Sequence, residues 1–257
     1  MTDVGYLLPT REAVMAGRPA TAPLLALAEW AEALGYRSIW VGDSILARPR
    51  HEPLTLLVAV AARTTTATLG TAVLLPSLRH PVVLAHLVAT VDLVSEGRLV
   101  LGVGMAGDTP ATRGEFDTTG TPFAARGRRM VETLDLCRAL WTGEPVSRQD
   151  GLFPVESALL LPKPYREGGP TIWAAGGGPI SRRRAAERYD GWFPIGADQK
   201  AFADGVADVT GLAAAAGRPR PMVAMYLTVS VDDHLVLRFV GDHERHLELL
   251  VELARTA

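Results

Sequence analysis

Polar side chains that could take part in catalysis follow two apolar segments of the chain. Asp43 and Ser44 come directly after Ser38–Val41, and His80 comes after Thr68–Leu75. A carboxylate accepts hydrogen bonds, a hydroxyl donates and accepts them, and an imidazole exchanges a proton near neutral pH. If both segments are strands of a parallel sheet, their carboxyl ends share the edge at which ligands bind. The same residue types also cap helices and form turns, so a structural role stays open for each.

A glycine-rich segment later in the chain could bind an anion. The sequence AAGGGP, Ala174–Pro179, leaves an apolar segment and enters a helical one. Backbone N–H groups at a helix N-terminus carry partial positive charge, which favours phosphate. The pattern predicts a phosphate site at Gly176, Gly177 and Gly178, to which Arg182 could add a charge. A plain glycine turn is the alternative.

A second glycine-rich segment, GVGMAG at Gly102–Gly107, follows another apolar run. It matches the G-x-G-x-x-G pattern of dinucleotide-binding proteins, but the polar residues after it predict a loop where that pattern requires a helix. We therefore expect Gly102 and Gly104 to let a flat ligand approach the backbone, since glycine has no Cβ. A dehydrogenase of the Rossmann type remains the alternative.

Other reactive side chains do not indicate a nucleophile or a metal site. Cys137 has apolar neighbours at helical spacing, which indicates a small core residue. His243 and His246 lie among glutamates, which is typical of a solvated helix. We predict no metal site.

Composition restricts the class of protein. The chain has 257 residues, of which 48% are hydrophobic, and a net charge of -2. This length suits one barrel domain over residues 1–257. The charges are spread out, so we expect neither nucleic acid nor a membrane surface as a partner. The single cysteine fits a cytoplasmic protein, and we see neither a signal peptide nor the ~18 apolar residues of a membrane span.

Strand and helix signals alternate along the chain. The expected strands are 3–8, 38–41, 68–75, 99–102, 171–175, 190–195 and 222–231, and the expected helices are 23–34, 52–63, 81–94, 126–141, 179–188, 200–216 and 243–254. Polar residues predict a long loop over Asp108–Pro122, and prolines exclude regular helix from Gly143–Gly169. The alternation predicts a parallel sheet with helices outside, and its continuity favours a (β/α)8 TIM-type barrel.

The last strand–helix unit departs from this pattern. Met222–Val231 and His234–Val240 both have strand composition, but only Asp232 and Asp233 lie between them. A crossover between parallel strands needs a dozen or more residues. Either the two segments form a hairpin, or one lies outside the barrel, or a helix is missing. We therefore expect a barrel whose last unit is abbreviated.

Several of these segments together resemble the bacterial luciferase-like flavin-dependent oxidoreductases. The segments are GYRSIWVGDS (35–44), LGTAVLLPSLRHPVVLAH (69–86), VDLVSEGRLVLGVG (91–104), GEFDTTGTPFAARGRRMVETL (114–134), PTIWAAGGGP (170–179) and DGWFP (190–194). They occur in the order of the family. The resemblance implies a (β/α)8 barrel that binds reduced FMN or the deazaflavin coenzyme F-420 at the carboxyl ends of its strands.

The resemblance also implies a role for individual residues. The flavin ring would be supported by the segment Thr71, Ala72 and Val73, often through a non-proline cis peptide. Asp43 would lie beside the ring, and Gly102 and Gly104 would face it. The cofactor phosphate would be held by Gly176, Gly177 and Gly178. Many relatives have a catalytic histidine where this chain has Ser44. A serine does not exchange protons as an imidazole does, so proton transfer would use another group, water or the flavin.

This resemblance favours a monooxygenase that uses reduced FMN, supplied by a flavin reductase, and oxygen to oxidise a small organic substrate. An oxidoreductase that transfers hydride with coenzyme F-420 is an alternative, because the acidic tail of F-420 could bind Arg182, Arg183 and Arg184. A non-catalytic flavin-binding protein is a further alternative. The resemblance also suggests a homodimer.

Overall fold

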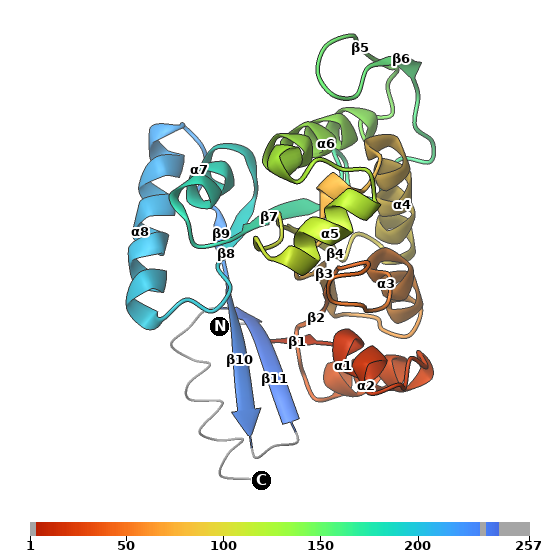
Figure 1. Ribbon diagram of the computed structural model, residues 1–257, viewed down its shortest axis with the longest axis vertical. Coiled ribbons are helices and arrows are strands. Elements are labelled where there is room, and N and C mark those ends of the chain that lie inside the picture. The colour runs from red at the N-terminus through yellow and green to blue at the C-terminus, as the bar shows by residue number, and fades with distance from the viewer. Residues whose placement is uncertain (1–3, 232–234, 242–257) are drawn as a thin grey trace.

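Seven parallel strands form the main sheet of the protein. The computed structural model describes residues 4–231 and 235–241, with side chains as far as Tyr226. In this part of the chain the sheet order is β1-β2-β3-β4-β7-β8-β9 (Figure 1). The strands are β1 Gly5–Leu7, β2 Ser38–Val41, β3 Thr68–Thr71, β4 Leu99–Val103, β7 Thr171–Ala175, β8 Gly191–Phe193 and β9 Met222–Val223.

Helices connect these strands and cover the outside of the sheet. They are α1 Thr10–Met15, α2 Ala22–Ala33, α3 Pro53–Ala61, α4 Pro81–Val94, α5 Pro110–Thr118, α6 Arg126–Leu140, α7 Pro179–Arg188 and α8 Gln199–Ala215, with short 3-10 turns η1 Pro76–Leu78 and η2 Phe123–Ala125. Neighbouring helices α2, α3, α4 and α6 pack in succession, and α7 packs against α8 (Figure 1). The predicted alternation of strands and outer helices is confirmed.

Aromatic rings inside the sheet show that it curls. Trp40 of β2 lies 5.5 Å from Trp173 of β7 and 6.1 Å from Phe193 of β8, measured between ring centroids. Strands β3 and β4 separate β2 from β7 in the sheet, so these side chains could not touch across a flat sheet. The strands therefore wrap around a common interior, as in the predicted TIM-type barrel.

Glycines on the strands make room for these rings. An added Cβ would lie 2.2 Å from the Trp40 ring at Gly70, 2.5 Å from the Trp173 ring at Gly191 and 2.7 Å from the Phe193 ring at Gly102. The glycines lie opposite the bulky aromatic rings, and together they fill the narrow interior without overlap.

The chain completes the curl with a hairpin instead of an eighth parallel strand. Strands β10 Met225–Val231 and β11 Leu235–Gly241 pair antiparallel. Tyr226 of β10 bridges to Ile195 after β8, and β11 lies beside β1 (Figure 1). The hairpin thus occupies the gap between the last and first parallel strands. This confirms the expectation that the two segments form a hairpin and that the last strand–helix unit is abbreviated. The expected helix 243–254 lies outside the described residues.

Two segments contain more structure than the sequence predicts. The expected loop Asp108–Pro122 contains α5, because Thr109 caps the helix by accepting the Thr112 N–H at 3.2 Å and Pro110 occupies the first turn. The irregular segment Gly143–Gly169 contains a small antiparallel hairpin, β5 Val146–Arg148 and β6 Val155–Ala158, which projects from the body of the protein (Figure 1). The prediction of a loop at α5 was wrong.

The core lies between the sheet and its helices. Cys137 of α6 is fully buried there, and its thiol donates to the Pro81 carbonyl at 3.4 Å. Burial raises the pKa of this thiol, which keeps it protonated and unreactive. None of the helices over the described residues combines the length and the apolar composition needed to cross a bilayer.

Candidate active site

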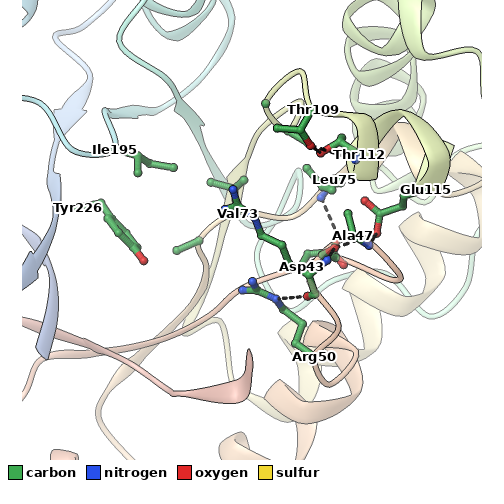
Figure 2. A pocket seen from close by; sticks show the side chains of 15 residues that line it. Asp43, Ala47, Arg50, Val73, Leu75, Thr109, Thr112, Glu115, Ile195 and Tyr226 are labelled. Atoms are coloured by element: carbon green, nitrogen blue, oxygen red, sulfur yellow. Dashed lines mark hydrogen bonds between the residues drawn. The ribbon is translucent and has the colours of Figure 1, made fainter. Parts of the chain in front are cut away.

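A pocket of about 220 Å³ opens at the carboxyl ends of the parallel strands. Figure 2 shows Val73 in the middle, Ile195 and Tyr226 on one side, and Thr109, Thr112 and Glu115 on the other. These residues come from the loops after β3 and β8, from β10 and from the α5 region. The edge that the sequence predicts for ligands is therefore hollow.

Asp43 lies in this wall, held by an arginine. Arg79 Nη1 lies 2.5 Å from Asp43 Oδ2, and Nη2 lies 3.1 Å from Oδ1. Asp43 Oδ2 also accepts the Leu75 N–H at 2.9 Å. Burial disfavours the charge of Arg79, but Asp43 and Glu52 beside it outweigh burial and raise the pKa of the guanidinium. The carboxylate thus ties the loop after β2 to the loop after β3.

Ser44 is bonded to a carboxylate from a distant element. Its Oγ lies 2.9 Å from Oε1 of Glu115 on α5, a residue that is 2% exposed. The same oxygen accepts the N–H groups of Ile45 and Leu46 at 2.5 and 2.8 Å. Glu115 therefore fixes the start of the β2–α3 loop against α5.

The segment after β3 lies directly on its neighbour β4. The Ala72–Val73 peptide is a non-proline cis peptide, as the family resemblance implies. Thr71 Oγ1 donates to the Gly102 carbonyl at 2.8 Å. An added Cβ would lie 2.0 Å from the Thr71 carbonyl at Gly102 and 2.7 Å from the Val73 side chain at Gly104. These two glycines therefore serve the close packing of β4 against this segment.

The loop between β7 and α7 leaves its backbone open. Gly176 has φ +111°, and an added Cβ at Gly177 or Gly178 would have no neighbour within 4 Å. Gly178 is the N-cap of α7, and Gly177 and Gly178 are exposed, so an anion can approach their N–H groups. Arg182 lies nearby in α7, but its Nε is 2.9 Å from Asp208 Oδ2.

The predicted residues are only partly brought together. Asp43, Ser44, Ala72 and Val73 line the pocket. His80 is exposed, holds the N-cap position of α4 and packs edge-on against Phe153 at 5.9 Å; it is not among the residues that line this pocket. Over the residues that the structure describes, there is also no cluster of three or more His, Cys, Asp or Glu that could hold a metal ion.

Sequence reasoning missed the partners that hold the predicted side chains. In the sequence, Arg79 and Glu115 stand out only as members of the family segments 69–86 and 114–134. The cap signal Thr109-Pro110 could have revealed α5, and with it a helical position for Glu115. No sequence signal links Glu115 to Ser44, which lies 71 residues away.

The geometry agrees with the comparison with known proteins. Residues 2–235 match the family of luciferase-like monooxygenases. The chain belongs to this family. This confirms the resemblance on which the fold and the site were predicted.

Two similar proteins carry different functional names. An F-420-dependent glucose-6-phosphate dehydrogenase from Amycolatopsis mediterranei (strain U-32) is 33% identical over 176 residues, which cover 66% of this chain and 52% of the relative. A crystal structure of a monooxygenase from Streptomyces bottropensis is 26% identical, with a TM-score of 0.76 over 86% of this chain and 69% of that one. The chain spans about half the length of the curated relatives it matches.

A third protein supports the fold alone. The oxygenating constituent of 3,6-diketocamphane monooxygenase from Pseudomonas putida, in complex with FMN, is 21% identical. Its TM-score is 0.70 over 86% of this chain and 66% of that chain. One similar protein is therefore named for F-420, and one protein of similar fold is in complex with FMN.

Proposed function

We propose that this chain is an oxidoreductase that binds coenzyme F-420 and transfers hydride between it and a small organic substrate. The observation that carries the proposal is the pocket at the strand ends, whose wall includes Asp43, Ala72 and Val73. The 33% identical relative named as F-420-dependent supports the choice of cofactor. When bound, the coenzyme supplies two-electron hydride chemistry.

The residues present fit such a cofactor at two places. Ala72 and Val73 would lie against its ring, because they form the wall of the pocket beside β4. Gly177 and Gly178 would hold its phosphate, because their N–H groups begin α7 and no side chain covers them. Arg183, which is exposed on α7, would add positive charge for the acidic tail.

The chain's own residues shape the rest of the pocket. Val73, Leu75 and Ile195 would exclude water from the substrate and contact its carbon skeleton. Asp43, paired with Arg79, keeps Leu75 in the wall by accepting its N–H. No histidine lines this pocket among the described residues. Ser44 occupies the position at which the family resemblance implies a catalytic histidine.

A monooxygenase that uses reduced FMN and oxygen is the second candidate. The monooxygenase from Streptomyces bottropensis, which is 26% identical over 86% of this chain, supports it. That function would need a flavin reductase to supply reduced FMN. Hydride transfer with F-420 would need no such partner.

Cofactor titration distinguishes the two candidates. The purified chain is titrated separately with F-420 and with FMN, and binding is followed by the change in cofactor fluorescence. Tighter binding of F-420 is expected, and reduction of bound F-420 by an alcohol would then identify the reaction. Tighter binding of FMN would favour the monooxygenase. Binding of neither would contradict both, and binding without any turnover would favour a non-catalytic flavin-binding protein.

A further inference from the structure

The hydrogen bonds of the Ser44 hydroxyl leave it a single free position. A serine hydroxyl has one proton to donate and two lone pairs that accept. Ser44 Oγ accepts the Arg48 N–H at 2.8 Å and lies 2.9 Å from Oε1 of Glu115. These two contacts use two of the three hydrogen-bonding sites of the hydroxyl, so one site remains free.

Glu115 determines whether the free hydrogen-bonding site of Ser44 is its proton or a lone pair. Its Oε1 accepts the N–H groups of Ile45, Leu46 and Ala47 at 2.5, 2.8 and 3.4 Å, so this oxygen acts as an acceptor toward its neighbours. A carboxylate oxygen in that role can only accept from Ser44 as well. The Ser44 proton is thus directed at Glu115, and the free position is a lone pair.

The pocket that Ser44 lines has a mixed wall. Ser44 lies there beside the apolar side chains of Val73, Leu75 and Ile195 and beside the hydroxyl groups of Thr109 and Thr112. We propose that Ser44, oriented by Glu115, accepts a hydrogen bond from an O–H or N–H group of the substrate. The pocket then selects a hydrogen-bond donor carried on an apolar carbon skeleton, and this specificity rests on the proposed function of the pocket as a substrate site.

The proposal separates the roles of the two residues. Ser44 is the binding residue, because it contacts the substrate. Glu115 is a positioning residue, because it acts only through the orientation of the Ser44 proton. A ketone offers only an acceptor, so it gains nothing from a hydroxyl in this state, whereas the alcohol of the same skeleton gains one hydrogen bond.

Binding of cyclohexanol and cyclohexanone to the full chain tests the proposal. Both dissociation constants are measured by ligand-observed NMR without added cofactor, so that no turnover occurs. We expect cyclohexanol to bind about three- to tenfold more tightly. Equal affinity, a preference for the ketone, or no detectable binding of either probe would overturn the proposal.

Substitutions at Ser44 and Glu115 test whether these two residues cause the preference for the alcohol. In Ser44→Ala the preference for the alcohol should vanish, whereas Ser77→Ala, which removes a buried hydroxyl that does not line this pocket, should keep it. Glu115→Ala frees the Ser44 proton, so the ketone should gain affinity relative to the alcohol. Glu115→Gln keeps an acceptor oxygen and should restore the preference.

The variant outcomes are decisive in both directions. A Ser44→Ala protein that still prefers the alcohol would overturn the role of Ser44, and this variant decides even if Glu115→Ala does not fold. A folded Glu115→Ala protein with unchanged preference would overturn the role of Glu115. Because these measurements need no cofactor, failure of the cofactor titration would contradict the proposed function alone.

Discussion

Asp43, which lines the pocket, forms a doubly hydrogen-bonded ion pair with Arg79, which lies 36 positions further along the chain. The Asp43 side chain is 2% exposed and that of Arg79 is 13% exposed. Two charges removed from water in this way stabilise each other only as a pair. The pair therefore couples the stability of the fold to the shape of the site.

Removal of one partner of this pair should destabilise the protein strongly. Arg79→Met leaves the Asp43 carboxylate buried without a compensating charge, and we expect a loss of about 3–5 kcal/mol in the free energy of unfolding. Urea denaturation measures the loss. The matched control is Lys200→Met, which breaks the pair with Asp204 whose side chains are 85% and 60% exposed. This control should leave the free energy of unfolding close to the wild-type value, because an exposed ion pair contributes little, and equal losses in the two variants would contradict the argument.

The elements that the sequence predicts with correct bounds share strong local signals. Ser38–Val41 and Thr171–Ala175 are apolar and bounded by polar residues or glycine, and Pro81–Val94 and Pro179–Arg188 begin with proline at the first helical position. Helix α5 was missed because its composition is polar and only its cap marks its start. The order of strands follows from the alternation, since parallel neighbours need crossovers.

The site could be predicted only as far as its place at the strand ends. Asp43 and Ser44 follow β2, and their position at the pocket is a consequence of the fold class. Their bonding to Arg79 and Glu115 depends on how distant loops pack, which local spacing does not encode. His80 illustrates the limit. The sequence offered it as a catalytic residue, but it caps α4 and does not line the pocket, whereas its neighbour Arg79 pairs with Asp43.

An added methyl group at Gly102 should disrupt the sheet. Its Cβ would lie 2.0 Å from the Thr71 backbone carbonyl, which cannot rotate away, and 2.7 Å from the Phe193 ring. Gly102→Ala should therefore cost about 3 kcal/mol or prevent folding. Gly114→Ala is the control, because it lies in α5 with no atom within 4 Å of the added Cβ. It should stabilise by about 0.5–1 kcal/mol, and thermal unfolding of both variants measures the contrast.

Asp92 should make stability depend on pH. The residue is fully buried on α4, and its Oδ2 accepts the Arg166 N–H at 2.9 Å. Burial raises the pKa of this carboxyl above 3.8, and the hydrogen bond from Arg166 opposes this only in part. The folded state therefore binds the proton more tightly than the unfolded state.

The sign of the effect follows from this linkage. Below the unfolded pKa the carboxyl is protonated in both states, and as pH rises to the folded pKa the wild-type protein loses stability. Asp92→Asn does not ionise, so its free energy of unfolding should rise relative to wild type as pH increases from about 4 to the raised folded-state pKa of Asp92. Urea denaturation at several pH values measures the difference, and a difference that stays constant over this range would contradict the prediction.

A negative charge at Gly177 should weaken binding of a phosphate-bearing cofactor. An added Cβ there meets no atom within 4 Å, so both Gly177→Ala and Gly177→Asp should fold. The carboxylate of Gly177→Asp would lie near the cofactor phosphate and repel it. We expect the dissociation constant of F-420 or FMN to rise about tenfold, whereas Gly177→Ala should change it less than about twofold.

The cofactor without its phosphate provides the decisive control for this variant. Riboflavin has the ring of FMN but no phosphate, so Gly177→Asp should leave the affinity for riboflavin at the wild-type value. If riboflavin loses affinity as much as FMN does, the variant has disturbed the pocket rather than an anion site. If neither ligand loses affinity, the loop before α7 does not contact the cofactor, and the phosphate must bind at another place on this edge of the sheet.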